Sequence, residues 1–183
     1  MADEITSASG VTRVGSSLYF YDGVELETTA SLIRELRILN NEHLTNGFNG
    51  VYAPIWLHIN SGGGSLWDAF AIADTIKAMS VPVHSISEGL VASAATIIAA
   101  ACHKRYTRLN TTFLIHQLEG GFWGTFDRIE GAMKMYQMNM EQLVKFYMTH
   151  SHLSEPQVRE ILSHDTWLSS QKMLDFGLVD QII

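Results

Sequence analysis

The chain has one cysteine among its 183 residues and no long uninterrupted run of apolar residues. The single cysteine, Cys102, excludes an intrachain disulfide and agrees with a reducing compartment. The most apolar window, Leu90–Cys102, is too short to span a bilayer. The N-terminus is polar and acidic through Thr6, so no secretion signal is predicted. We therefore expect a cytoplasmic protein without a membrane partner.

Positive charge is also scarce. The chain carries 12 Lys and Arg residues against 19 Asp and Glu residues, which gives a net charge of −7. Its densest basic cluster, His103–Arg105 with Arg108, is short and is predicted to be a solvated loop. No stripe of cations is present to neutralise phosphates, so nucleic acid is excluded as a partner. His150 and His152 lack a nearby Cys or carboxylate, and we predict neither a metal site nor a cofactor.

Apolar residues make up 46% of the chain and charged residues 17%, which is typical of one globular domain. Strands and helices are predicted to alternate: strand Ser17–Tyr21, helix Thr28–Asn40, strand Ile55–Ile59 and helix Leu66–Met79. This order predicts an α/β fold with parallel strands, whose functional residues follow the carboxyl ends of the strands. Residues 1–16 show no apolar periodicity and are predicted to be a flexible segment before a domain over residues 17–183.

Ser93 lies where a hydroxyl nucleophile would be presented. The small-residue turn Gly89–Ala95 follows the apolar strand Val81–Ser87 and opens the helix Ala95–Cys102. At such a junction the free N–H groups of a helix N-terminus can stabilise an oxyanion. Another apolar strand, residues 112–115, ends at His116. This pair suggests nucleophilic catalysis, and the alternative is a small packing residue with a histidine satisfied in the core.

A glycine cluster upstream favours the catalytic interpretation. The strand Ile55–Asn60 runs into Ser61-Gly62-Gly63-Gly64-Ser65 before the next helix. Glycines there allow positive φ and a close backbone approach, so an N–H group can act as an oxyanion donor. The alternatives are a flexible turn and a phosphate-binding loop. The latter is disfavoured because no Gly-Lys-Ser/Thr follows and the dinucleotide-binding spacing is absent.

Three motifs in this order, residues 60–65, 92–94 and 115–117, resemble the Clp protease proteolytic subunit (ClpP) family of serine peptidases. Asp165-Thr166-Trp167-Leu168-Ser169 and Gly177-Leu178-Val179-Asp180 are similar to two further motifs of that family. The resemblance covers roughly residues 17–183. It implies an α/β, ClpP/crotonase-like β-α-β superhelix with a handle strand and a handle helix.

Carried over by position, the resemblance implies a role for five residues. Ser93 matches the nucleophile, His116 the general base and Asp165 the carboxylate that orients the histidine. The backbone N–H groups of Gly64 and Ala94 match the oxyanion donors. These roles agree with general chemistry, since an imidazole removes the serine proton and a carboxylate fixes its tautomer.

Two other carboxylates could compete with Asp165. Asp175 falls inside a short predicted helix, Ser170–Phe176, and Asp180 follows a glycine C-cap at Gly177. Asp175 is therefore better explained as a solvated residue, and Asp180 as a turn residue or structural polar group.

The resemblance also implies an assembly. The methionine-rich stretch Phe126–Thr149 is predicted to be the handle helix and Gly120–Gly124 the handle strand, through which rings join face to face. We expect a homo-oligomeric ring, as a heptamer or a tetradecamer, that encloses its sites and takes unfolded polypeptide or peptide as substrate. The family's ATPase unfoldase is an implied partner, although residues 1–16 lack the pattern of the family's first helix.

The sequence thus predicts a Clp-type serine endopeptidase that hydrolyses peptide bonds of unfolded polypeptides by an acyl-enzyme mechanism. Two alternatives are kept open. A crotonase-like acyl-CoA enzyme would use oxyanion donors on glycine-rich turns and would not need Ser93, His116 and Asp165. A catalytically silent assembly subunit is disfavoured because all three residues are present.

Overall fold

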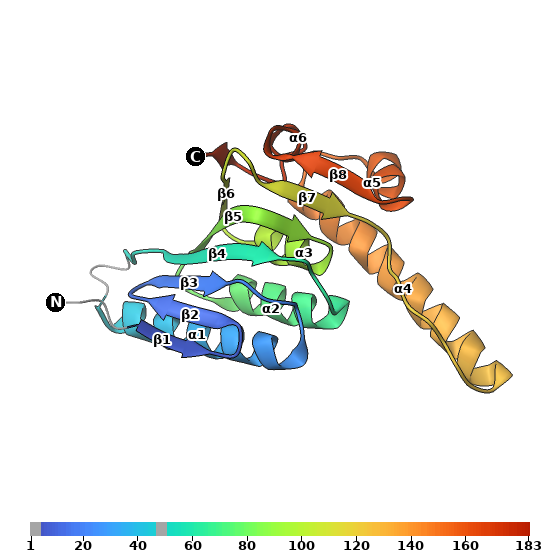
Figure 1. Ribbon diagram of the computed structural model, residues 1–183, viewed down its shortest axis with the longest axis horizontal. Coiled ribbons are helices and arrows are strands. Elements are labelled where there is room, and N and C mark those ends of the chain that lie inside the picture. Colours follow the sequence, from blue (N-terminus) through green and yellow to red (C-terminus); the bar gives the residue numbers. More distant parts are fainter. Residues whose placement is uncertain (1–4, 47–50) are drawn as a thin grey trace.

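The computed structural model describes residues 5–46 and 51–183, and a mixed nine-stranded sheet forms its centre (Figure 1). The strand order is β1-β2-β3-β4-β5-β6-β9, and β7 pairs with β5 and β8. The strands are β1 Ile5–Ala8, β2 Val11–Val14, β3 Ser17–Phe20, β4 Ile55–Ser61, β5 Val83–Ala92, β6 Lys104–Thr107, β7 Thr112–Ile115, β8 Thr166–Ser169 and β9 Gln181–Ile182. The helices are α1 Leu26–Asn46, α2 Leu66–Ala78, α3 Ala94–Ala101, α4 Phe126–His150, α5 Glu155–Leu162 and α6 Ser170–Asp175. The predicted α/β class is confirmed.

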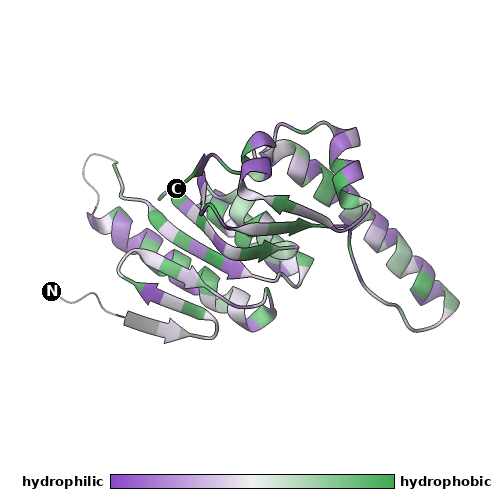
Figure 2. Ribbon diagram, turned by 45° about the horizontal axis from the view of Figure 1, so that its top comes forward, coloured by the Kyte–Doolittle hydropathy of each residue, from purple (hydrophilic) through white to green (hydrophobic). Residues whose placement is uncertain are grey.

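The middle of the sheet is parallel, as the alternation of strands and helices predicts. β3 pairs with β4 and β4 pairs with β5, both in parallel, and α1 and α2 form the connections. On α1 the predicted apolar stripe of Leu32, Leu36 and Leu39 is buried in the core. Figure 2 shows apolar residues concentrated on the strands near the middle of the sheet. Burial of these faces is the main stabilising contribution to the fold.

Strand β5 is longer than the sequence predicts. The expected strand ended at Ser87 and was followed by a turn over Gly89–Ala95, but β5 continues to Ala92 and only Ser93 forms the turn. Gly89 adopts φ 61°, a left-handed conformation that glycine tolerates within an irregular strand. The amide of Leu90 then donates to the Asn60 side chain at 3.2 Å. The longer strand pairs with β6 through its first half and with β7 through its second.

The basic cluster is a strand, so the prediction of a solvated loop was wrong. Lys104–Thr107 forms β6, parallel to β5. The two arginines of the cluster are paired at the sheet surface, since Arg105 bonds to Asp180 and Arg108 Nε donates to Glu88 Oε1 at 3.1 Å. Lys104–Thr107 is a strand because it pairs with β5, which is distant in sequence. The polarity of the residues themselves does not reveal this pairing.

Residues 5–14 form the antiparallel pair β1 and β2, and β2 pairs with β3. The sequence predicts a flexible segment over residues 1–16, whereas the structure places most of it in a strand pair at the edge of the sheet (Figure 1). Residues 1–4 lie outside the described residues. The β2 register sets Val11, which is buried, opposite Phe20. One buried side chain and backbone pairing thus hold a segment that has no apolar periodicity of its own.

The long helix α4 projects from the body of the molecule (Figures 1 and 2). It matches the predicted helix Phe126–Thr149 almost to the residue. The preceding residues 116–125 form neither strand nor helix, so the structure does not contain the strand predicted over Gly120–Gly124. In the described part of the chain, no helix is both long and apolar enough to cross a membrane.

Candidate active site

Three strand ends converge on one side of the sheet. β4 leads into the glycine loop 62–64, β5 leads into Ser93, and β7 leads into His116. β5 and β7 are parallel with Ala92 opposite Leu114, and the Ser93 amide donates to the Leu114 carbonyl at 2.8 Å. The carboxyl ends of adjacent parallel strands therefore bring together residues that lie far apart in sequence.

Ser93 has an unusual backbone conformation. Its φ of 55° and ψ of −128° make it the only non-glycine residue with positive φ among those described. Such a conformation costs on the order of 1–3 kcal/mol and persists where the surrounding structure enforces it. The sharp turn between β5 and α3 leaves the hydroxyl without a capping bond to the helix. The Ser93 side chain is therefore directed to another partner, as in nucleophile elbows.

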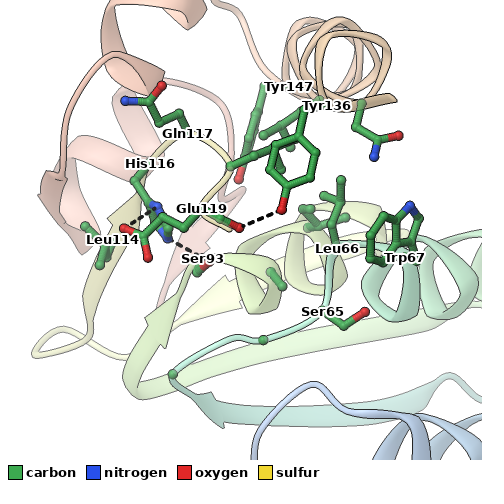
Figure 3. A pocket seen from close by; sticks show the side chains of 17 residues that line it. Ser65, Leu66, Trp67, Ser93, Leu114, His116, Gln117, Glu119, Tyr136 and Tyr147 are labelled. Carbon is green, nitrogen blue, oxygen red and sulfur yellow. Dashed lines mark hydrogen bonds and ion pairs between the residues drawn. The ribbon is translucent and has the colours of Figure 1, made fainter. Parts of the chain in front are cut away.

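That partner is His116. Its Nε2 lies 2.8 Å from Ser93 Oγ (Figure 3). Its Nδ1 is buried and has no hydrogen-bond partner among the described residues. When Nε2 accepts the serine proton, Nδ1 must carry the ring hydrogen and needs an acceptor on that side. The arrangement thus brings a serine hydroxyl into contact with an imidazole whose other ring nitrogen is buried.

Two carboxylates lie close to the His116 ring. β7 and β8 are antiparallel with Ile115 opposite Thr166, so that Asp165 comes beside His116. The ligand atoms of His116, Glu119 and Asp165 all lie within 4.8 Å of one another. Glu119 Oε1 is 3.8 Å from Nδ1 (Figure 3). Neither carboxylate forms a hydrogen bond to Nδ1 in the part of the chain described.

The sequence did not indicate Glu119. It follows His116 by three residues in an irregular loop, and neither periodicity nor a motif marks it. Its side chain is 78% exposed, and its backbone carbonyl accepts a hydrogen bond from the Tyr136 hydroxyl of α4 at 3.2 Å (Figure 3). The spacing of three residues from a candidate base at a strand end was the one available signal.

The glycine loop lies against the Ser93 turn. A Cβ atom placed on Gly63 would come within 2.6 Å of the Ala92 carbonyl oxygen and 2.7 Å of Ser93 Cβ. Two backbone hydrogen bonds join this loop to Val24: the Val24 amide donates to the Gly63 carbonyl, and the Ser65 amide donates to the Val24 carbonyl. The Gly64 amide takes part in neither bond. Ala94 is the first residue of α3, and the first N–H groups of a helix lack intrahelical partners. Both predicted oxyanion donors therefore belong to the wall beside Ser93.

These groups line a cavity of about 450 Å³. Ser93, His116, Gly64 and Ala94 form one side, and side chains of α4 form another (Figure 3). The rest of the wall is largely apolar, with Leu66, Trp67, Leu118 and Leu143. A volume of this size and an apolar lining suit a side chain or short segment of a larger substrate.

The rival carboxylates have other partners. Asp180 bonds to Arg105, and although burial by itself raises the pKa of this carboxyl, those hydrogen bonds and the charge of Arg105 lower it. Asp175 is exposed and accepts from the Gln171 side chain at 3.0 Å. Cys102 is buried in the core, and burial raises the pKa of its thiol to about 12, which favours packing over nucleophilic chemistry.

Alanine at Gly63 is expected to destabilise the protein by more than about 1 kcal/mol and to lower its activity. Gly63 has φ 93°, and the added Cβ would press on the Ala92 carbonyl and on Ser93. Gly62→Ala is the matched control, since a Cβ there meets nothing within 4 Å. Urea unfolding of both variants measures the difference, and equal midpoints would contradict the close packing of this loop on Ser93.

The family model and the curated relatives that match this chain all belong to the Clp protease family. Residues 12–183 match the family model for Clp protease. Similar curated proteins are ATP-dependent Clp protease proteolytic subunit 2 of Treponema denticola, 30% identical over 87% of this chain and 77% of the relative, and subunit 2 of Cutibacterium acnes, 31% identical over 100% and 87%. Subunit 1 of Protochlamydia amoebophila is 30% identical over 100% of this chain and 86% of the relative.

Proposed function

The chain belongs to the Clp protease family, and on this premise we propose that it is a serine endopeptidase whose nucleophile is Ser93. The observation that carries the residue assignment is the 2.8 Å contact between Ser93 Oγ and His116 Nε2 at a strained strand-to-helix turn. A hydroxyl is a weak nucleophile until an adjacent base removes its proton. Labelling by a fluorophosphonate, which reacts only with an activated serine, is the direct test.

The proposed reaction has two halves. Ser93 Oγ attacks the carbonyl carbon of the peptide as its proton passes to His116 Nε2, and the amides of Gly64 and Ala94 stabilise the oxyanion. The intermediate collapses when the C–N bond breaks, and the leaving amine takes the proton from His116. Water then attacks the acyl-enzyme with His116 again as base, and release of the carboxylic acid restores the Ser93 hydroxyl.

Asp165 is proposed as the carboxylate that accepts the Nδ1 hydrogen of His116. Its place before β8, opposite the end of β7, supports this role. Its carboxylate has an oxygen within 4.8 Å of a His116 ring nitrogen, and it makes no hydrogen bond to Nδ1. Catalytic hydrogen bonds are often long without substrate and tighten when it binds. Substrate in the cavity would therefore be expected to bring the Asp165 carboxylate onto Nδ1.

Two alternatives make different predictions. An acyl-CoA enzyme on this fold would retain its activity when Ser93 is replaced. A silent subunit would fail to react with fluorophosphonate at all. The relatives are named proteolytic subunits, which supports the peptidase.

We also propose a homo-oligomeric ring, as a heptamer or a tetradecamer, with the first half of α4 in its contacts. The buried residues of α4 all lie between Asn139 and Tyr147. In the first half of the helix Tyr136 contacts the preceding loop at the Glu119 carbonyl and the Phe122 ring, while most of the other side chains are exposed. Trp123, Phe126, Met133 and Met138 are 100%, 81%, 51% and 63% exposed. Large exposed apolar groups that gather on one element are typical of an interface. A ring would also keep Ser93 away from folded proteins and admit unfolded polypeptide.

Replacing Met133 and Met138 together by glutamate is expected to shift the protein to smaller species, because two carboxylates would be desolvated in the contact. Analytical ultracentrifugation measures the shift. Gln142→Glu is the control, since this exposed residue lies on the half of α4 that packs on the body. A wild-type protein that sediments as a monomer at micromolar concentration would contradict the proposed assembly.

The relatives are named ATP-dependent, and we propose an ATPase unfoldase as partner of this chain as well. Pull-down of the assembled protein with such an ATPase tests it. The cytoplasmic location expected from the sequence stays a prediction.

A further inference from the structure

The ring nitrogen of His116 that faces away from Ser93 lacks a hydrogen-bond partner among the described residues. This nitrogen, Nδ1, is fully buried, although the side chain as a whole is 13% exposed. Glu119 Oε1 lies 3.8 Å from this nitrogen, and the ligand atoms of His116, Glu119 and Asp165 lie within 4.8 Å of one another. A buried nitrogen without a partner costs free energy unless another group binds it.

The three groups differ in origin and in accessibility. His116 is held by the end of β7, Asp165 by the start of β8, and Glu119 by the irregular loop that leads to α4. Glu119 and Asp165 are both exposed. Because Glu119 and His116 both line the cavity beside Ser93 and Asp165 is exposed outside it, an ion can approach the imidazole through the cavity or from the Asp165 side.

The ligand set has the chemistry of a zinc site. One imidazole nitrogen and two carboxylate oxygens are ligands that Zn²⁺ accepts, with water in the fourth position of a tetrahedron. Mg²⁺ prefers an all-oxygen environment and is a poor match for the imidazole. Small side-chain movements are sufficient to bring atoms that lie within 4.8 Å of one another around one ion.

We propose that His116 Nδ1, Glu119 and Asp165 form a binding site for Zn²⁺, and that zinc bound there reversibly inhibits the enzyme. The binding stands on this geometry alone, whereas the inhibition rests on the proposed function of Ser93 and His116.

Inhibition follows from the tautomer of the imidazole. A neutral imidazole has one N–H group and one nitrogen with a free lone pair. If the Nδ1 lone pair binds zinc, the hydrogen is on Nε2, which then faces Ser93 Oγ as a donor. Nε2 can no longer accept the serine proton, and Asp165 is withdrawn from its orienting role. The zinc-bound enzyme thus holds the tautomer opposite to the one that catalysis needs.

Calorimetric titration of the assembled protein with ZnCl₂ tests the binding. We expect one ion per chain, and we expect the same stoichiometry for Ser93→Ala, because Ser93 is not a ligand. Glu119→Gln is expected to weaken the affinity by about 10-fold or more, since even groups that only support a metal ligand have effects of this size. Glu160→Gln, which removes an exposed carboxylate of α5, should bind zinc as the wild type does.

Peptide hydrolysis with increasing zinc tests the inhibition. Each variant is compared with its own rate without zinc, and a chelator should restore that rate. Glu119→Gln should require about 10-fold more zinc or higher for half inhibition, and Mg²⁺ should not inhibit. Unchanged zinc affinity in both Glu119→Gln and Asp165→Asn would place the ion elsewhere and overturn the proposal, as would the absence of binding. If zinc binds as expected but peptides are never hydrolysed, the peptidase assignment fails and the site stands.

Discussion

Ser93→Ala is expected to abolish fluorophosphonate labelling and to lower peptide hydrolysis by at least about 10⁴-fold. The hydroxyl at this turn is the only serine oxygen in contact with His116 among the described residues. His116→Ala should cost about as much, and the double variant should be little worse than either, because the two residues act as a unit. The measurements are covalent labelling followed by mass spectrometry and steady-state hydrolysis of a fluorogenic peptide.

Folding of the Ser93 variant must be separated from chemistry. Serine and alanine both carry a Cβ, so the strain of φ 55° is similar in each and the stability should change little. Ser163→Ala, at an exposed serine that does not line the cavity, is the matched control for labelling. Hydrolysis at the original rate by a folded Ser93→Ala protein would reject Ser93 as nucleophile.

Asp165→Asn is expected to lower kcat by about 10⁴-fold while the protein remains folded. An amide in this position can donate to Nδ1 and thus favours the tautomer that cannot accept the Ser93 proton. Because Asp165 is exposed and makes no hydrogen bond to His116, its loss should leave the stability almost unchanged. Hydrolysis assays together with urea unfolding distinguish the two effects.

Three further carboxylates provide the comparison for Asp165. Asp175→Asn and Asp180→Asn should remain active, since their side chains pair with Gln171 and Arg105 away from the cavity. Glu119→Gln is the decisive variant, because Glu119 Oε1 lies 3.8 Å from the same nitrogen. Full activity of Asp165→Asn combined with a large loss in Glu119→Gln would transfer the orienting role to Glu119.

The sequence predicted the elements whose signal is local. The methionine-rich stretch Phe126–Thr149 matches α4, periodicity predicted the buried stripe of α1, and the order of strands and helices predicted the parallel middle of the sheet. Ser93 and His116 could be selected because small residues and apolar strands end beside them in the sequence itself. These features depend on residues within a few positions of one another, so the sequence alone is sufficient for them.

Contacts between distant segments decided the rest. β6 is a strand because its backbone pairs with that of β5. β5 continues past Gly89 because its last residues pair with β7. The sequence suggested that Ser93 and His116 act as a pair, because each follows the end of an apolar strand. The 2.8 Å distance between Ser93 Oγ and His116 Nε2 depends on the register that sets Ala92 opposite Leu114. For Glu119 the only local signal was its spacing of three residues from His116, because it lies in an irregular loop that no periodicity marks. The sequence determines which side chains are available, whereas the distances between them in the candidate site follow from long-range strand pairing and packing.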